Sequence, residues 1–225
     1  MKTTDARRAL TLVLVAAGDG RRMGGISKVW RLWEGHPLWW WSLTAFQGQV
    51  AATVLVVAAD RVAAAQTWVG SAEDVVGVAG GSSREASVDL GLARVATPYV
   101  AVHDGARPLV SRALVDRVWR AALETGAAVP GLPPTDTVKV VHRGLVARTL
   151  PRHHLVAVQT PQIFRTDWLR DALAQERRGV TDDSMAVEAR GHAVAVVEGD
   201  PMNQKLTVEW DWLWLAAAWP ERDRP

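Results

Sequence analysis

Cysteine is absent from the 225 residues of the sequence. Without thiols the chain cannot form disulfides, ligate a metal through sulfur or use a cysteine nucleophile, and this composition agrees with a reducing compartment. Long apolar runs are missing as well, because none approaches the roughly 20 residues that a membrane-spanning helix requires. Residues 1–8 are polar and charged and the apolar segment after them is short, which argues against a signal peptide. We therefore expect a cytoplasmic protein that does not enter a membrane.

An excess of charge of one sign is also lacking. The formal net charge is only +2, and the basic residues are dispersed along the chain. This composition does not predict nucleic-acid binding, which requires a concentrated basic surface. Any cationic site must therefore be assembled locally from a few residues.

Tryptophan, by contrast, is abundant. The 12 tryptophans fall mainly in two clusters, at residues 30–41 and 210–219. Because an indole ring has a large apolar area to bury, we predict that both clusters pack in the core or at a subunit contact.

The order of apolar and amphipathic segments indicates an α/β fold. The pattern predicts strands at 10–15, 52–58, 75–78, 98–102, 127–130 and 193–197, and helices that include 61–69, 111–124, 167–175 and 183–189. Alternation of this kind implies right-handed βαβ units and a Rossmann-like, mainly parallel sheet flanked by helices. The length suits a single domain over residues 1–225. Ligands of such sheets bind at the carboxyl ends of the strands, where the loops after the first and third strands both lie.

The loop after the first strand carries Gly18 and Gly20, which allow a tight turn whose amides face a ligand. Met23 occupies the third glycine position of a dinucleotide fingerprint, and no glycine precedes Lys28 as a Walker loop requires. The pattern G-x-G-x-R-M with a later lysine is instead similar to the signature loop of nucleotidyltransferases that join a nucleoside triphosphate to a sugar or polyol phosphate. In such a loop, amides cradle a triphosphate, and Arg22 and Lys28 neutralise charge that rises during attack at phosphorus. The alternative is a glycine turn with solvated basic residues.

Residues 80–84, Gly-Gly-Ser-Ser-Arg, follow the third predicted strand. The glycines let the backbone approach a flat base, and the serines can offer hydroxyls to a ligand or cap the next helix. A capped helix start alone would explain the same residues.

Asp104 follows the fourth predicted strand, between His103 and the sequence Gly-Ala-Arg107. A carboxylate at the end of a central strand is costly unless it is paired or binds a cation, so Asp104 is a candidate ligand or magnesium residue. Arg107 is either the ion-pair partner of Asp104 or a phosphate ligand. We expect His103 to be a structural imidazole bonded to backbone.

Together the motifs G-x-G-x-R-M, GG-x-x-R-x-x-SV, HD-x-ARP and Gln159-Thr160-Pro161-Gln162 resemble those of the 2-C-methyl-D-erythritol 4-phosphate cytidylyltransferases of the non-mevalonate isoprenoid pathway. The resemblance runs from about residue 10 to 218. It implies attack by the phosphate of methylerythritol phosphate on the α-phosphorus of CTP, giving CDP-methylerythritol and pyrophosphate. It also implies Mg²⁺ bridged mainly by the phosphates, with Asp104 as the candidate protein ligand.

The resemblance assigns roles to individual positions. Arg22 and Lys28 resemble transition-state stabilisers, and Arg152 and Lys205 resemble the residues that position the polyol phosphate. The positions that resemble nucleotide-binding ones are Ala16, Ala17, Gly18, Gly20, Gly81, Ser82, Ser87 and Asp104. Those that resemble substrate-binding ones are Asp104, Arg107, Thr137, Arg152 and Lys205.

Residues 133–155 lie outside the alternating pattern and include a predicted β-hairpin with Gly144 in its turn. In the resembled family this segment is an arm that crosses to a second subunit. The resemblance therefore implies a homodimer whose active sites take Thr137 and Arg152 from the partner. The pair His153-His154 does not predict a metal site, because adjacent side chains of a strand point to opposite faces.

The sequence departs from the family pattern beside Lys28. Ser27 stands where a proline is usual, and Val29-Trp30 replaces a common Gln-Tyr. A serine gives the loop more freedom than a proline, so loop order and turnover are in question.

Two alternatives to this function remain open. A cytidylyltransferase for another polyol phosphate, such as ribitol 5-phosphate, shares the nucleotide loop. A non-catalytic nucleotide-binding module could keep the same fold, although it would not need charged residues at five dispersed positions, namely Arg22, Lys28, Asp104, Arg152 and Lys205.

Overall fold

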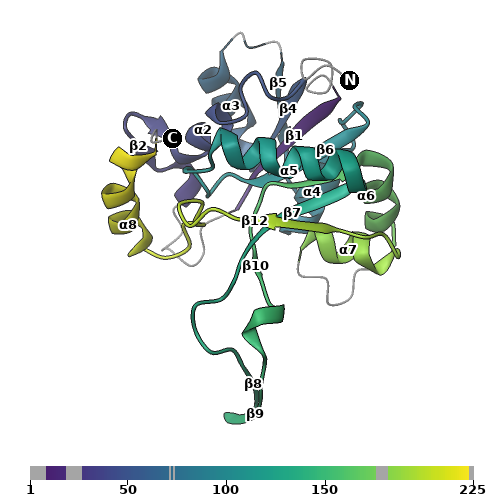
Figure 1. Cartoon of the computed structure of the whole chain (residues 1–225). Helices are drawn as coiled ribbons and strands as arrows, with labels where there is room; N and C mark the ends of the chain where they lie inside the picture. The colour runs from purple at the N-terminus through teal and green to yellow at the C-terminus, as the bar shows by residue number, and fades with distance from the viewer. Residues whose placement is uncertain (1–8, 19–26, 71, 73, 176–181, 223–225) are drawn as a thin grey trace.

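The computed structural model describes residues 9–18, 27–70, 72, 74–175 and 182–222 of the chain. A twisted, mixed sheet forms the centre, with helices on both faces and an arm that projects from the body (Figure 1). The strand order is β10-β7-β11-β6-β1-β4-β5, and β12 also pairs with β7. The predicted α/β class is confirmed.

The parallel half of the sheet matches the predicted strands. Its bounds are β1 Leu10–Ala16, β4 Ala52–Val57, β5 Val75–Ala79 and β6 Tyr99–Asp104. β1 lies between β4 and β6 and runs parallel to both. Nearly every residue of β1 is buried, as expected for a strand covered by helices on both faces.

The other half of the sheet mixes directions. β7 Ala127–Leu132 pairs in parallel with β12 Ala195–Glu198, whereas β10 Ala157–Val158 is antiparallel to β7. β11 Gln162–Arg165 runs antiparallel between β6 and β7. The sheet is therefore parallel around the first motif and mixed on the far side.

Alternate residues of the strands feed two cores. On one face Leu10, Leu12 and Leu14 pack with the apolar sides of three helices, which are α2 Leu38–Thr44, α3 Val62–Val69 and α5 Arg112–Thr125. On the other face Val13 packs with a second set, formed by α4 Arg84–Leu92, α6 Thr166–Leu173 and α7 Asp183–Ala189. The period-2 alternation of strand side chains produces this division.

A third core joins the two tryptophan clusters. Helix α8 Asp211–Ala218 and the 3-10 helix Trp219–Glu221 pack on the small hairpin formed by β2 Leu32–Trp33 and β3 His36–Pro37. The ring centroid of Trp33 lies 6.0 Å from that of Trp212 and 5.8 Å from that of Trp219. Core packing is therefore confirmed for residues such as Trp39, Trp212 and Trp219, whereas Trp210 is 76% exposed.

The arm contains a two-stranded hairpin, β8 Lys139–His142 and β9 Leu145–Thr149. Its turn is formed by Arg143 and Gly144, both with positive φ. A 3-10 helix, Arg152–His154, follows. The expectation that His153 and His154 lie on opposite faces of a strand is wrong, because the turn brings their ring centroids to 4.0 Å. Among the helices described here, none combines the length and apolar character needed to cross a bilayer.

Candidate active site

A cavity of about 640 Å³ lies at the carboxyl ends of β1, β5 and β6. This is the edge of the sheet at which the sequence places the nucleotide loops. The residues that line it come from all three predicted motifs, from the segment directly after β4 and from the segment before α8: Val15, Ala16, Ala17, Gly18, Lys28, Val29, Ala58, Ala59, Gly80, Gly81, Ser82, Ser83, Arg84, Ser87, Asp104, Ala106, Lys205 and Thr207.

The Gly80 and Gly81 segment forms one wall. A Cβ atom on Gly80 would lie 2.4 Å from the Cβ of Ala17, so only glycine lets the two motif loops approach this closely. The Gly81 amide donates to the Ser87 hydroxyl at 3.1 Å, and that hydroxyl donates to the Ser83 carbonyl at 2.8 Å. Ser83 also caps α4, since its side chain accepts from the Ala86 amide. The capped helix start and the cavity wall are therefore one structure.

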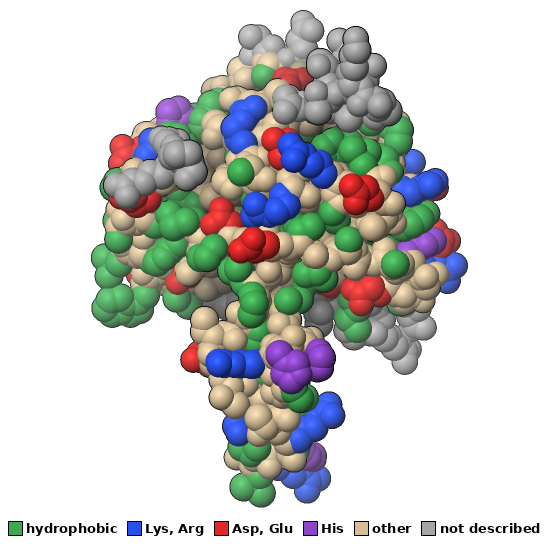
Figure 2. Space-filling model, in the orientation of Figure 1, with side chains coloured by type: hydrophobic (Ala, Val, Ile, Leu, Met, Phe, Trp, Pro, Cys, Tyr) green, Lys and Arg blue, Asp and Glu red, His purple; other side chains and the backbone are tan. Residues whose placement is uncertain are grey.

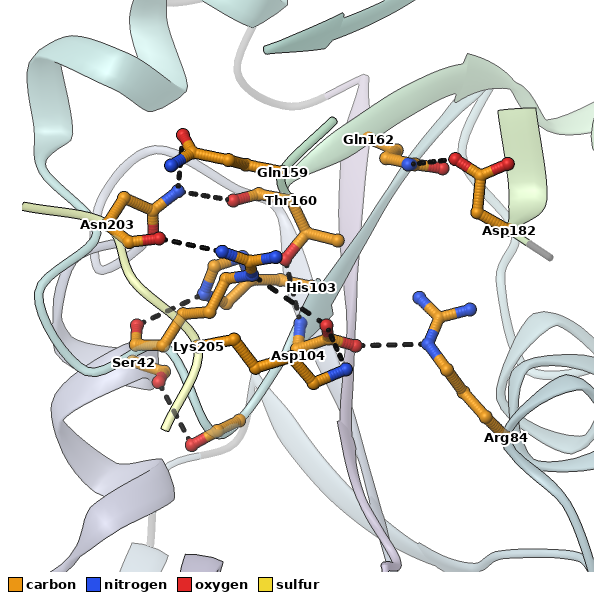
Figure 3. A network of polar contacts seen from close by, with 12 residues as sticks. Ser42, Arg84, His103, Asp104, Gln159, Thr160, Gln162, Asp182, Asn203 and Lys205 are labelled. Carbon is orange, nitrogen blue, oxygen red and sulfur yellow. Dashed lines mark hydrogen bonds and ion pairs between the residues drawn. The ribbon is translucent and has the colours of Figure 1, made fainter. Parts of the chain in front are cut away.

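Asp104 is the anionic centre of the site (Figure 3). One carboxylate oxygen lies 2.8 Å from the Lys205 nitrogen, and the other lies 3.0 Å from Arg84 Nε. Burial by itself raises the pKa of the Asp104 carboxyl, but the surrounding cations outweigh it and hold that pKa well below its usual range. The side chain is thus an ionised acceptor, paired as its position at the end of β6 requires.

Arg84 is a site residue to which the sequence analysis gave no role. Its Nη1 lies 2.9 Å from a carboxylate oxygen of Asp183, the first residue of α7, while its Nε contacts Asp104. Burial raises the pKa of the Asp183 carboxyl; the charge and hydrogen bond of Arg84 oppose this effect but do not outweigh it. The motif GG-x-x-R contains Arg84, but the approach of α7 that gives the residue its second partner is a tertiary event.

Arg107 lies beside Asp104 but does not line the cavity. Its Nε is 3.8 Å from an Asp104 oxygen, and its Nη1 donates to the Asn203 carbonyl at 2.7 Å. Burial lowers the pKa of this guanidinium, and the Asp104 charge opposes the effect. In this structure Arg107 is an ion-pair partner that ties the segment before Lys205 to β6.

Thr160 and His103 form a buried chain of hydrogen bonds that ends at the Asp104 backbone amide. The Thr160 hydroxyl accepts from the Asp104 amide at 3.1 Å and lies 3.0 Å from His103 Nδ1. Since the Arg107 carbonyl, 3.4 Å from His103 Nε2, can only accept, Nε2 carries the proton and Nδ1 accepts from Thr160. Burial lowers the pKa of His103 to about 3. The imidazole is therefore a neutral structural residue, in accord with the prediction.

Lys28 opens the 3-10 helix Lys28–Trp30 and lines the cavity. Asp211 contributes to its electrostatic surroundings, and the Asp211 carboxylate also accepts from the Thr207 hydroxyl at 3.0 Å. Burial raises the pKa of Asp211, but the amides of Thr207 and Val208, together with the Lys28 charge, lower it overall. The start of α8 is thereby tied to the cavity.

Four further predicted residues are not among the residues described at the cavity. Gly20 and Arg22 fall outside the described residues. Thr137 and Arg152 belong to the arm, where Arg152 Nη1 donates to the Thr135 carbonyl, and neither of the two lines the cavity. The structure brings together the remaining nucleotide positions with Asp104, Lys28 and Lys205.

The cavity is suited to a polyanion. Within the described part of the chain, its charged lining residues are three cations, Lys28, Arg84 and Lys205, and one acid, Asp104. Guanidinium and ammonium groups of this kind bind phosphate oxygens and stabilise the charge that develops when a phosphoryl group is transferred. Among the residues described, no group of three acidic or histidine side chains is placed to hold a metal ion.

Comparison with known proteins agrees with this geometry. Residues 10–220 match the sequence profile of the family described as 2-C-methyl-D-erythritol 4-phosphate cytidylyltransferase, IspD. A protein of that name from Acidobacterium capsulatum is 40% identical over 227 residues, which cover 92% of this chain and 95% of the relative. The crystal structure of the enzyme of that name from Thermus thermophilus has a TM-score of 0.76 and 36% identity, and the match covers 92% of this chain and 97% of that one.

Some relatives are longer. The bifunctional enzyme IspD/IspF of Dinoroseobacter shibae is 39% identical over 96% of this chain, but the match covers only 55% of the relative. The chain thus spans little more than half the length of such bifunctional relatives. By its profile match over most of its length, the chain belongs to the family of 2-C-methyl-D-erythritol 4-phosphate cytidylyltransferases.

Proposed function

We propose that the chain transfers the cytidylyl group of CTP to 2-C-methyl-D-erythritol 4-phosphate, giving CDP-methylerythritol and pyrophosphate in isoprenoid precursor biosynthesis. One observation carries the proposal: ionised Asp104, paired with Lys205 and Arg84, lies in the same cavity as the Gly80 and Gly81 wall and Lys28. Family membership and this geometry support the same chemistry. The cysteine-free sequence favours the cytoplasm as its place of action.

The reaction needs positioning more than acid or base groups. A phosphate oxygen of the acceptor forms a bond to the α-phosphorus of CTP, and the bond from that phosphorus to the β-phosphate oxygen breaks. Because the attacking phosphate is already an anion at neutral pH, no general base is required. Lys28 and Arg22 would neutralise the charge that rises on the triphosphate.

The nucleotide would lie against the first and second motifs. Ala16, Ala17 and Gly18 end β1 at the cavity, and Gly81, Ser82 and Ser87 face them. The close approach of Gly80 to Ala17 leaves backbone groups, rather than long side chains, on this wall. Such a wall suits a flat base and the backbone-directed contacts that the family resemblance implies.

The acceptor would bind at Asp104 and Lys205. An ionised carboxylate accepts hydrogen bonds from polyol hydroxyls, and Lys205 would turn from Asp104 toward the incoming phosphate. Arg107 would contribute through the position of Asp104, since its guanidinium is bonded to the Asn203 carbonyl.

Among the described residues that line the cavity, Asp104 is the side chain that could hold Mg²⁺. Magnesium is commonly held by one or two carboxylates together with substrate phosphates, and Asp104 is the acid that lines the cavity among the described residues. When bound, the ion would neutralise phosphate charge that the protein cations leave uncompensated.

We further propose that the active protein is a homodimer in which the arm of each chain reaches the cavity of the other. Thr137 and Arg152 lie on the arm rather than at the cavity of their own chain. Apolar side chains share the surface of the arm with basic ones (Figure 2), and Leu145 is 75% exposed. A second copy would cover this apolar area and bring the two polar residues to a site.

Pyrophosphate release by the purified protein tests the activity. CTP and Mg²⁺ would be supplied with methylerythritol phosphate, with ribitol 5-phosphate or with no acceptor. Release only with methylerythritol phosphate is expected. Release with ribitol phosphate alone would transfer the proposal to that acceptor, and silence with both, from a protein that binds CTP, would indicate a binding module.

A further inference from the structure

Ser27 makes a contact that joins two parts of the nucleotide cavity. Its hydroxyl donates a hydrogen bond to the Gly18 carbonyl, with an oxygen-to-oxygen distance of 2.7 Å. Gly18 lies just after the end of β1, and Ser27 directly precedes Lys28. The bond therefore links the end of a core strand to the residue before the cation Lys28. Both Gly18 and Lys28 line the cavity.

The 3-10 helix that follows Ser27 holds the Ser27 backbone in place. The Ser27 carbonyl accepts from the Trp30 amide at 3.0 Å, which closes the 3-10 helix that begins at Lys28. Val29, within that helix, is 5% exposed and packs in the core. The hydrogen bond from the Ser27 hydroxyl to Gly18 therefore connects the end of β1 with a 3-10 helix that is packed against the core.

The backbone of Ser27 has the conformation of a proline. Its φ is −63°, close to the value of about −65° at which a proline ring locks this angle. Serine has no such lock, so the chain before Lys28 has more conformations to lose when the site forms. The hydrogen bond of the Ser27 hydroxyl to Gly18 restrains this backbone segment, as the ring of a proline would by fixing φ.

We infer that Ser27 is a positioning residue of the nucleotide site, which holds the Gly18 backbone and Lys28 at a fixed separation for the triphosphate of a nucleoside triphosphate. The inference rests on the proposed function and deepens it. Its effect falls on the nucleotide rather than on the acceptor, because Asp104 and Lys205 are held by other contacts. A neutral hydrogen bond of this kind changes an equilibrium by about three- to tenfold.

Four variants test the inference. Ser27→Ala removes the hydroxyl, Ser27→Thr keeps a hydroxyl, and Ser27→Pro imposes the observed φ without a hydroxyl. Thr67→Ala is the matched control, because Thr67 also donates from an exposed hydroxyl to a backbone carbonyl, that of Ala63, but lies on α3 away from the cavity lining. Calorimetry would give the dissociation constant for CTP with Mg²⁺, and steady-state rates would give kcat and both Michaelis constants.

Ser27→Ala is expected to raise the dissociation constant and the Michaelis constant for CTP about three- to tenfold, with the Michaelis constant for the acceptor unchanged. Ser27→Pro is expected to return CTP affinity to within about twofold of the original, and Ser27→Thr and Thr67→Ala to leave it unchanged. Equal CTP affinity in Ser27→Ala and the original chain would overturn the inference and leave the proposed function standing. Failure of the original chain to bind CTP would overturn both.

Discussion

The Lys205 ammonium lies 2.8 Å from an Asp104 oxygen, so a cation and an anion of the site hold each other directly. Asp104 ends the central strand β6, whereas Lys205 belongs to the segment that leads to α8. This ion pair fixes that segment to the sheet. It also holds the Lys205 ammonium at the cavity.

Asp104→Asn should destabilise the chain because it leaves Arg84, Lys205 and Arg107 near one another without their shared anion. We expect a loss of about 2–4 kcal/mol in the free energy of unfolding, since the carboxylate is buried but two of its partners are partly exposed. Urea unfolding at neutral pH measures it. Asp171→Asn, which breaks the exposed pair with Arg190, should change stability by less than about 0.5 kcal/mol. Equal effects of the two changes would contradict the central role of Asp104.

Lys28→Ala and Arg22→Ala should each lower turnover by at least about a hundredfold, because each removes a cation from the charge that develops on the triphosphate. Pyrophosphate release at saturating substrates measures the loss, and circular dichroism checks that the fold is kept. Lys28 lines the cavity, whereas the expectation for Arg22 rests on its motif. Near-normal turnover in either variant would remove that residue from its role.

Mixing two impaired variants, at an acceptor concentration too low for Arg152→Ala to turn over, tests whether the arm serves the partner. Arg152→Ala alters the arm, and Lys28→Ala alters the body of the chain. If each cavity takes its arm from the other chain, a mixed dimer contains one intact site, and equal mixing should restore about a quarter of the original activity. Arg152→Ala alone should raise the Michaelis constant for the acceptor. No recovery after subunit exchange, shown by mixed dimers on native mass spectrometry, would mean that each arm serves its own chain.

The buried imidazole of His103 predicts a pH dependence of stability. Burial lowers its pKa from 6.5 to about 3. At a pH between these two values, the imidazole binds a proton in the unfolded chain but not in the folded chain. Stability therefore falls as the pH is lowered through this window, by at most about 1.4 kcal/mol per pH unit from this group. Urea unfolding at several pH values between 7 and 4 should show a shallower slope for His103→Gln. Parallel slopes for the two proteins would refute the assignment.

The parallel half of the fold and the Gly80 and Gly81 wall of the cavity could be predicted because their signals are local. The buried run of β1, the paired glycines at residues 80 and 81 and the cap at Ser83 each specify structure within a few residues. Their meeting at one edge follows from the rule that strands of a parallel sheet end together. The predicted strand at 52–58 therefore lies within one residue of β4.

The missed features depend on distant parts of the chain. Arg84 bridges Asp104 and Asp183, and its pairing with Asp183 requires α7 to pack near the start of α4 on the same face of the sheet. Antiparallel β11 has four residues, too short for its direction to be read from periodicity. His153 and His154 were predicted to lie on a strand, but the 3-10 turn after Pro151 rotates their rings together. No local pattern separates these outcomes.

The packing of Trp33 against Trp212 and Trp219 sets an order of events during synthesis. The strands β1, β4 and β5 leave the ribosome early, yet the layer that covers β2 is supplied by α8. A contact between residues so far apart in sequence forms late and closes a long loop. The nascent chain must therefore carry an uncovered tryptophan surface until α8 has been made, and the cavity gains Lys205 only shortly before that step.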